Sequence, residues 1–464
     1  MTETRPARHR AVVIGGGMTG MLAASVLAEF ADVTIIERDT LPGEPAPRKG
    51  LPQARHAHLL WSGGVKALDQ LLPGIIDQLV DRGAWRARIM YDLVSKAPSG
   101  PWFRRFNTPT TNVVCSRDLL DAVVRAEVLQ NPRITLSERT EAVALEGTAV
   151  RVTGIRVHTK GVGESSLAAD LVVDASGRGS RADTWLDQLS LPAAAKKTVD
   201  AGVVYASRIF RAPSGAASDF PIVNVQANPA APPGQGGILL PIERGLWLAT
   251  LSGTRDGEPT DKNDDFVPFA KALRDPIIGD LLAEAEPLTP VAISRSTANT
   301  RRYFEKAPRW PEGFAVVGDA VAAYNPVYGH GLTVSAQCAL ALRDTLRKRD
   351  LNAPQTARHI QRAVASPVGN AWNLAVGQDI FYPDATEEGP TRAEKLGAAF
   401  IDRAVDAGAR NPTAQRYLLA VMSMEKQPAH LFSPGMLVRM LFGPKARHLD
   451  GPPLTPAERN SASA

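Results

Sequence analysis

Cysteine is nearly absent from this 464-residue chain. Its two cysteines, Cys115 and Cys338, lie far apart and belong to no C-x-x-C pair or Cys/His cluster. The sequence therefore predicts neither disulfides nor zinc and fits a reducing compartment. His56 and His58 form an H-x-H pair. A metal site needs a third ligand and none is evident nearby, so we expect no metal.

The chain also lacks an uninterrupted apolar run of membrane-spanning length, which takes about 20 residues. A short Arg/His arm at Met1 leads straight into an apolar run, so we expect no signal peptide and a cytoplasmic protein. The net charge is +5, but no basic stripe is interleaved with aromatics, which argues against nucleic-acid binding. The charge mildly favours anionic ligands.

Residues 11–38 contain an apolar run, a glycine-rich turn, an apolar helical segment and a second apolar run. We expect buried strands over 11–14 and 33–36 and a helix over 21–30. The turn has G-x-G-x-x-G spacing, formed by Gly15, Gly17 and Gly20. Together with the acidic Glu37, these parts fall at the distances of a dinucleotide-binding βαβ unit.

Each part of this unit has a physical role. Gly15 makes the strand-to-helix turn, Gly17 lets a pyrophosphate approach the backbone, and Gly20 lets the helix pack close to the strand. The helix N-terminus offers free N–H groups and a positive dipole end. Glu37 can accept hydrogen bonds from an adenosine ribose and would repel a 2′-phosphate. The unit predicts FAD or NAD and does not decide between them.

One later segment repeats this strand–glycine–helix pattern. A strand expected over 314–317 is followed by Gly318, a loop with Gly329 and Gly331, and a long apolar helix over 332–346. Two such phosphate-binding devices suit a large ligand held at both ends. Ser116–Leu129 is an amphipathic helix with Ser116 as N-cap. A cation in its first turn, Arg117, suggests an anionic partner, although a solvated surface arginine fits the pattern equally well.

The rest of the chain divides by composition. Alternating and apolar runs predict strands near 89–111, 134–157, 171–173 and 203–251, and residues 261–286 are acidic and helical in pattern. The domain assignment that follows is 1–75, 112–190 and 292–346 for a discontinuous nucleotide-binding domain, 76–111 and 191–291 for a β-rich domain, 347–450 for C-terminal helices, and 451–464 for a disordered tail.

Three stretches together resemble the flavin-dependent monooxygenases of the aromatic-hydroxylase type. They are Gly15-x-Gly17-x-x-Gly20 with Glu37, Asp174-Ala175-Ser176-Gly177 with Ser180 and Arg181, and Gly318-Asp319-Ala320 with Pro326, Gly329 and Gly331. The resemblance implies an α/β fold with a Rossmann-like FAD-binding domain, a β-sheet substrate domain and C-terminal helices. It also implies FAD as cofactor and NADPH or NADH as reductant.

The resemblance assigns roles to individual residues. Asp319 would bond the ribityl or pyrophosphate region, Arg117 would reach the cofactor, and Val143 would contact adenine. Residues 326–332 would lie beside the flavin ring, whose reduced form the helix dipole stabilises. The expected cofactor-binding residues are Gly15, Gly17, Met18, Thr19, Gly20, Glu37, Arg38, Arg48, Gln53, Arg117, Val143, Asp174, Gly177, Gly318, Asp319, Pro326, Gly329, Gly331 and Leu332.

More narrowly, residues 48–64, 170–181 and 325–331 resemble the bacterial epoxidases of polyether-antibiotic assembly, which act on polyketide polyenes. The match implies epoxidation of a small, apolar, polyene-like substrate with O₂, by way of a flavin C4a-hydroperoxide. Ser176 stands where aromatic hydroxylases usually have Asp, and Asp174 replaces a Gly, which bears on the reductant's site. The W-x-W-x-I-P pattern of halogenases is absent.

Direct oxygen transfer to an alkene needs no side-chain nucleophile, so we assign no catalytic residue. We expect the protein to position the substrate and exclude water in an apolar cavity with few titratable groups. Core packing is the competing interpretation for each aromatic. The candidate wall residues are Tyr205, Phe210, Trp247, Tyr324, Tyr328 and His330.

Three alternatives remain open. An aromatic hydroxylase would want a polar or basic group to activate a phenol. A flavin reductase of the geranylgeranyl-reductase kind would not consume O₂ with its substrate. A redox-responsive flavoprotein could instead control a partner protein through the apolar, basic segment 431–445, which could also contact a membrane. Pro434 and Gly435 shorten any helix there, so a packed tail helix is favoured over membrane contact.

Overall fold

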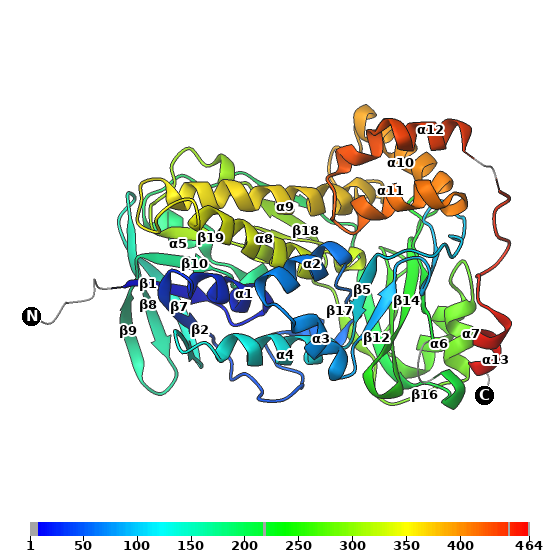
Figure 1. Cartoon of the computed structure of the whole chain (residues 1–464), viewed down its shortest axis with the longest axis horizontal. Coiled ribbons are helices and arrows are strands. Elements are labelled where there is room, and N and C mark those ends of the chain that lie inside the picture. The colour runs from blue at the N-terminus through cyan, green and yellow to red at the C-terminus, as the bar shows by residue number, and fades with distance from the viewer. Residues whose placement is uncertain (1–7, 217–219, 444–445, 463–464) are drawn as a thin grey trace, which may run out of the picture.

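The computed structural model of the chain describes residues 8–216, 220–443 and 446–462 (Figure 1). Most of the N-terminal arm considered above therefore lies outside the described residues. One half of the molecule is built on a five-stranded parallel sheet with strand order β19-β10-β1-β2-β6. These strands are β1 (His9–Ile14), β2 (Ala31–Ile36), β6 (Ile134–Ser137), β10 (Leu171–Asp174) and β19 (Phe314–Val316). Their apolar sequences suit strands covered on both faces.

Helices cover this sheet, and two of them begin at the glycine turns. Helix α1 packs against α4 and α8, and α8 packs against α2 and α9 (Figure 1). The Ser116 hydroxyl accepts a hydrogen bond from the Leu119 amide, which confirms the predicted N-cap. The helices of this half are α1 (Met18–Leu27), α2 (Ser62–Leu71), α3 (Ile75–Asp81), α4 (Arg117–Leu129), α5 (Ala182–Gln188), α8 (Gly331–Leu346) and α9 (Thr356–Asp379).

Three small sheets are separate from the parallel sheet. All of their pairings are antiparallel. Their strands are β7 (Thr140–Gly147), β8 (Val152–Thr159) and β9 (Gly163–Ala168); β3 (Trp85–Arg88) and β5 (Thr111–Val114); and β11 (Lys196–Val199), β18 (Asn299–Arg302) and β20 (Ala322–Ala323). Cys115 and Cys338 are both buried and free.

The other half holds a seven-stranded sheet. Its strand order is β16-β12-β15-β14-β13-β4, with β17 also paired to β12. The strands are β4 (Leu93–Lys96), β12 (Val204–Arg211), β13 (Ile222–Val225), β14 (Gln235–Ile242), β15 (Leu246–Gly253), β16 (Glu286–Pro287) and β17 (Ala292–Ser294). One face is covered by α6 (Phe266–Lys271) and α7 (Ile277–Ala283). The sequence predicted one helical segment here, but α6 ends at Lys271 and a second short helix, α7, begins after its N-cap Pro276.

The C-terminal helices pack on the opposite face of this sheet (Figure 1). They are α10 (Arg392–Arg410), α11 (Pro412–Met422) and α12 (Pro434–Phe442), with a 3₁₀ turn over Pro428–Phe432 between the last two. None of the helices in the described ranges combines the length and apolar character needed to cross a bilayer.

The expectation of a disordered tail over 451–464 is wrong for most of that segment. Helix α13 (Pro456–Ser461) forms there and begins with a capping box between Thr455 and Glu458. Leu454 packs into the core of the seven-stranded sheet, and the Arg105 Nη1 atom donates to both carboxylate oxygens of Glu458 at 2.7 and 2.8 Å. The Pro- and Ser-rich composition outweighed these local signals in the sequence-based interpretation.

Candidate functional site

Three glycine-containing turns follow three adjacent strands. Strands β1, β10 and β19 are parallel neighbours, so the turns after them meet at one edge of the sheet, where open α/β folds bind ligands. A Cβ atom on Gly15 would lie 2.9 Å from the Ala175 carbonyl oxygen, and one on Gly318 would lie 2.7 Å from the Thr19 side chain. The motifs recognised separately in the sequence therefore form one site.

The first turn has the geometry of a phosphate-binding turn. Gly15 has a φ of +100°, a region that glycine occupies readily. A Cβ on Gly20 would lie 1.8 Å from the Gly15 carbonyl oxygen, so only glycine fits there. Gly17 caps α1 without any side-chain hydrogen bond, which leaves first-turn N–H groups available to an anion. Met18 and Thr19 begin that helix.

Two side chains border this turn. The Glu37 carboxylate accepts hydrogen bonds from the backbone amides of Gly16 at 2.8 Å and Asp39 at 3.0 Å. The Arg48 guanidinium lies 3.4 Å from Glu37 and 3.4 Å from the Cβ position of Gly17. Its buried Nε has no hydrogen-bond partner among the described residues. An unused donor beside uncapped helix N–H groups fits a bound diphosphate.

The other residues expected at the adenosine end differ in how firmly the structure holds them. Val143 sits at a β-bulge in β7, and the same strand is bonded to the first turn's neighbourhood through the Thr140 amide and the Glu37 carbonyl, 2.8 Å apart. The side chains of Arg38 and Gln53 are exposed. Neither makes a side-chain hydrogen bond within the described part of the chain, so the structure gives them no anchored position.

The middle motif is folded by its own carboxylate. Asp174 is buried and accepts bonds from the Ser176 amide and hydroxyl and from the Ser180 hydroxyl, at 2.6 to 2.9 Å. Burial raises the pKa of Asp174, while these bonds act in the opposite direction. The side chain therefore holds the turn, and its contact with the cofactor stays a prediction. Gly177 has open space around it and a φ of +77°.

Sequence reasoning missed Arg178 in this motif. Its guanidinium donates to the carbonyls of Ala298 and Tyr324, both at 2.7 Å. Its charge acts on Asp319 and opposes the effect of burial, which raises the pKa of that carboxyl. A cation directly after a glycine turn was a visible signal, but its two carbonyl partners lie far along the sequence.

Asp319 has the features of a ligand contact. Its carboxylate accepts no hydrogen bond from any described residue and lies 3.8 Å from the Cβ position of Gly331, at the start of α8. Arg117 also acts on it through charge. The nearest anion to Arg117, however, is Asp121 in its own helix, 2.7 Å away. Free acceptor oxygens at this place fit the hydroxyl groups of a ribityl chain.

The loop from Pro326 to Gly331 carries unused polar groups at the N-terminus of α8. The His330 Nε2 atom donates to the Met422 carbonyl at 3.1 Å, and burial lowers the pKa of His330 to about 4. The ring is therefore neutral near pH 7, and its Nδ1 has no partner among the described residues; the same holds for the Thr333 hydroxyl. Leu332 is buried beside them.

A buried network of side chains holds this loop. The Asp379 carboxylate accepts bonds from the Tyr328 hydroxyl at 2.5 Å and from the amides of Asn299 and Asn325 at 2.6 and 2.8 Å. The Asn325 oxygen accepts from the Tyr205 hydroxyl at 2.6 Å. We call these five residues the Asp379 network. From the other side, the Trp61 indole donates to the Tyr328 carbonyl at 3.1 Å.

The predicted pocket residues separate into two groups. Tyr205, Tyr328 and His330 are brought together at the loop. Phe210 and Trp247 pack with Phe220 and Phe266 on the face covered by α6 and α7. They are core residues because successive strand residues alternate faces, and positions 205 and 210 of β12 are an odd number apart. Tyr324 is a core residue as well: its hydroxyl donates to the Val368 carbonyl in α9.

The sheet face directed toward the loop is more polar than the sequence predicted. His56 Nδ1 lies 2.7 Å from the Ser207 hydroxyl, which lies 2.7 Å from the Thr250 hydroxyl. The His56 and Tyr205 rings are 5.9 Å apart. Burial, aided by the nearby Arg55 charge, lowers the pKa of His56 to about 4. The expectation of few titratable groups is therefore wrong here, although each of these groups is bonded within the protein.

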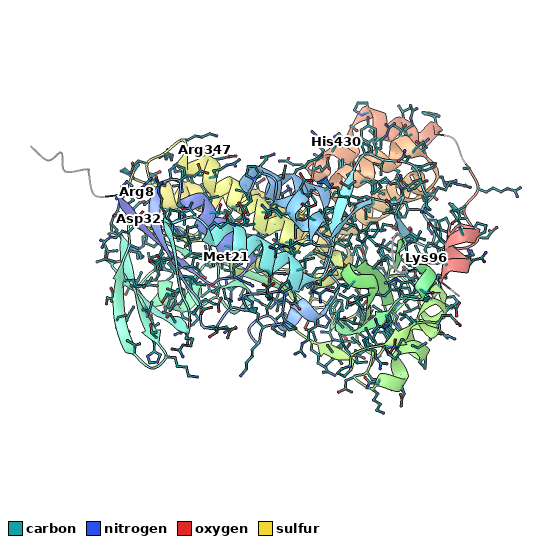
Figure 2. All side chains as sticks on the ribbon, turned by 60° about the horizontal axis from the view of Figure 1, so that its bottom comes forward. Arg8, Met21, Asp32, Lys96, Arg347 and His430 are labelled. Carbon is teal, nitrogen blue, oxygen red and sulfur yellow. The ribbon has the colours of Figure 1, made fainter. Side chains whose placement is uncertain are left out.

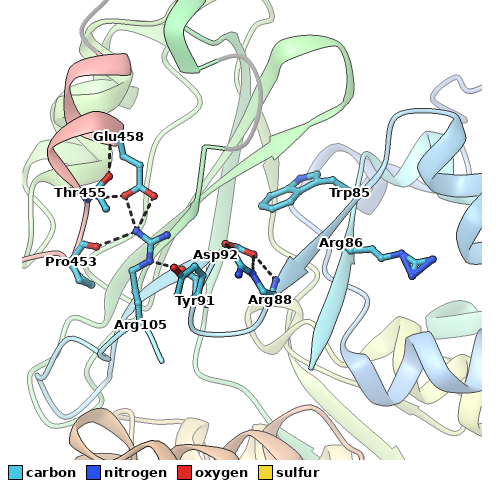
Figure 3. A pocket seen from close by; sticks show the side chains of 9 residues that line it. All are labelled: Trp85, Arg86, Arg88, Tyr91, Asp92, Arg105, Pro453, Thr455 and Glu458. Atoms are coloured by element: carbon cyan, nitrogen blue, oxygen red, sulfur yellow. Dashed lines mark hydrogen bonds and ion pairs between the residues drawn. The ribbon is translucent and has the colours of Figure 1, made fainter. Parts of the chain in front are cut away.

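A cavity of about 700 Å³ lies elsewhere, beside α13 (Figure 3). Tyr91 lies between the guanidinium groups of Arg88 and Arg105, 4.0 and 5.1 Å from its ring centre. Arg105 is held by Glu458 and Arg88 by Asp92. No residue predicted for cofactor or substrate lines this hollow. Among the described residues, His56 and His58 belong to no three-residue cluster able to hold a metal ion.

Comparisons with known proteins bear on the family and the fold of the chain. Residues 11–183 match the sequence model of a family described as FAD dependent oxidoreductase. Protein Rv3254 of Mycobacterium tuberculosis is 32% identical over 429 residues, 90% of each chain. The flavin-dependent brominase Bmp2 has a TM-score of 0.64 at 14% identity, over 93% of this chain and 97% of that one. PqsL, a probable FAD-dependent monooxygenase from Pseudomonas aeruginosa, has a TM-score of 0.58 at 16% identity, over 84% and 99%. The predicted fold class is confirmed.

Proposed function

The chain belongs to the FAD-dependent oxidoreductases, as a relative of Protein Rv3254, and from that premise we propose that it is an NAD(P)H-consuming flavin monooxygenase that epoxidises alkenes of an apolar, polyketide-like polyene. The observation that carries the proposal is the meeting of three glycine turns beside the loop 326–331. Uncapped helix N-termini line that place together with the Asp319 carboxylate, which accepts no hydrogen bond from the described residues, and these groups fit FAD.

FAD, when bound, supplies electron transfer from the nicotinamide to O₂ and delivers one oxygen atom to the substrate. The N–H groups of α1 would hold the pyrophosphate, with Arg48 beside them. Glu37 would bind the adenosine ribose and Asp319 the ribityl hydroxyls. The N-terminus of α8 would stabilise negative charge at the edge of the reduced ring, because its dipole end is positive.

The side chains around the loop favour oxygen transfer without a protein acid or base. His56 bonds to Ser207, and Tyr205 and Tyr328 donate to Asn325 and Asp379. Burial raises the pKa of both tyrosines well above 10, so they stay neutral near pH 7. An alkene needs no proton removed from it before it accepts oxygen. The protein's contribution is then to position the substrate and exclude water.

Hydroxylation of a phenol is a second candidate, favoured by the polar sheet face. His56 and Tyr205 lie close together there. A phenol hydroxyl that entered between them could replace the hydrogen bonds that they now make to Ser207 and Asn325. This reaction requires a group that accepts the phenol proton. Replacement of His56 by Gln should abolish phenol hydroxylation and leave alkene epoxidation largely unchanged.

The test begins with the visible spectrum of the purified full chain after FAD addition. Loaded protein is then mixed with NADPH or NADH, O₂, and either a synthetic linear triene or a simple phenol. We expect O₂ consumption that depends on the substrate. We also expect the triene to be converted into products that carry one or more additional oxygen atoms. A protein that binds no flavin ends the cofactor assignment. Oxygenation of the phenol alone would replace epoxidation by the second candidate.

A further inference from the structure

Helix α12 is apolar on both of its sides. Its inner side packs through Met436, which is fully buried against the C-terminal helices. Its outer side presents Leu437, Val438, Leu441 and Phe442 to solvent, with Leu441 64% and Phe442 81% exposed. A helix with one face in a core and one in water carries polar residues on the water side. The sequence-based expectation of a packed tail helix therefore accounts for one side only.

The exposed apolar surface continues onto neighbouring elements. Phe432 in the preceding turn is 61% exposed, and its ring stacks on Phe400 of α10 with 4.5 Å between centroids. Leu396, one helical turn before Phe400, is 74% exposed. Six of the eleven exposed large apolar side chains among the described residues lie here. We call them the apolar face: Leu396, Phe432, Leu437, Val438, Leu441 and Phe442. Such a concentration marks an interaction site.

Basic side chains outnumber acidic ones around the apolar face, although α10 also carries Glu394, Asp402 and Asp406. The described residues 426–443 and 446–449 include three basic side chains, Lys426, Arg439 and Arg447, and no Asp or Glu. On α10, Arg392 and Arg403 lie four residues before and seven residues after Leu396, so they share its side of the helix. Both are exposed. The face therefore suits an anionic surface.

A second copy of the chain is a poorer match than an anionic surface. Two copies meeting through this face would bring their arginines together, and like charges repel. The outer side of α12 has Arg439 as its one polar side chain, so it offers few hydrogen bonds to a folded protein partner. Acyl chains require none.

We propose that the apolar face docks on an anionic lipid surface, with its apolar side chains among the acyl chains and its arginines against the headgroup phosphates. Interfacial helices insert to about 5–10 Å in this way. The face lies at an outer corner of the molecule, at the upper right of Figure 1, away from the β7–β9 sheet. His430, labelled in Figure 2, marks the same C-terminal region, opposite Asp32.

The full FAD-loaded chain is sedimented with phosphatidylcholine vesicles, with and without phosphatidylglycerol. The test variant is Leu441→Asp/Phe442→Asp. The matched control is Val150→Asp/Val162→Asp, at side chains 75% and 83% exposed in the turns of the β7–β9 sheet. We expect binding to the anionic vesicles that salt weakens, a loss of at least about tenfold in the test variant, and no loss in the control. Arg439→Ala should weaken binding about fivefold.

Three results would overturn the proposal. They are no binding to phosphatidylglycerol vesicles, equal binding to both kinds of vesicle, and equal loss in the test and control pairs. Light scattering distinguishes the second-copy alternative. That alternative predicts a dimer of the parent chain, a monomeric Leu441→Asp/Phe442→Asp variant, and no binding of either to vesicles. Phe442→Ser alone repeats the test with a milder change, and equal thermal midpoints of all variants show that folding is intact.

Discussion

The turn after β1 and the loop before α8 bring similar groups to the ligand edge, but they are held in different ways. The first turn is fixed by near neighbours: Gly20 packs on Gly15, and Glu37 bonds the Gly16 amide. The loop 326–331 is fixed by Asp379 and Trp61, about 50 residues after it and about 270 before it. The first is a local device, whereas the second exists only once the tertiary structure has formed.

The largest expected effect comes from closing the first turn. Gly20→Ala would place a methyl group 1.8 Å from the Gly15 carbonyl oxygen. The backbone must move, so we expect a loss of about 3 kcal/mol or more of stability and no FAD binding. Thermal denaturation of the apoprotein and flavin fluorescence titration measure the two effects.

Gly17→Ala separates binding from folding. Its new methyl group would meet only the flexible Arg48 side chain, at 3.4 Å. The apoprotein should keep its stability, while ADP and FAD both lose affinity because the methyl blocks the approach of the pyrophosphate. Gly43→Ala has no heavy atom within 4 Å and serves as the control. Unchanged ADP binding by Gly17→Ala would place the pyrophosphate elsewhere.

How much the sequence could predict follows the same division. Strands β1, β10 and β19 and their turns were recognised because their signals lie within short windows. Asp379 could not be found, because its partners Asn299 and Asn325 lie 80 and 54 residues away and an aspartate near the end of a helix has no distinctive pattern. The positions of Phe210 and Trp247 were within reach, since strand alternation alone separates Phe210 from Tyr205.

The third prediction weakens the loop and leaves the first turn intact. Asp379→Ala would leave the Tyr328 hydroxyl and the Asn299 and Asn325 amides without their acceptor, which costs about 3 kcal/mol. FAD affinity should fall about tenfold or more, while ADP affinity should stay within about twofold, because ADP occupies only the first turn. Hydrogen exchange of the loop amides should accelerate.

Tyr328→Phe is the matched milder change at this loop. It removes one donor to Asp379 and should give a smaller loss of FAD affinity in the same direction. If Asp379→Ala weakened ADP and FAD binding equally, the two turns would not be independent, and the comparison drawn here would fail.

The smallest effect is expected at Asp319, whose replacement should stabilise the apoprotein but weaken FAD binding. Burial raises the pKa of this carboxyl. Its contribution to stability is therefore fully present below the unfolded-state pKa, about 3.9, and is lost as pH rises through the folded-state pKa. Asp319→Asn removes this loss, so the variant apoprotein should be more stable than the parent near neutral pH by roughly 1 kcal/mol. That difference should vanish in acid. FAD should bind several-fold more weakly to the variant, because the amide oxygen is a poorer acceptor than a carboxylate.

Thermal midpoints across a pH series test the stability difference, and FAD titrations test the affinity difference. If the Asp319→Asn apoprotein were less stable than the parent at neutral pH, the charged Asp319 carboxylate would have to accept hydrogen bonds that the structure does not show.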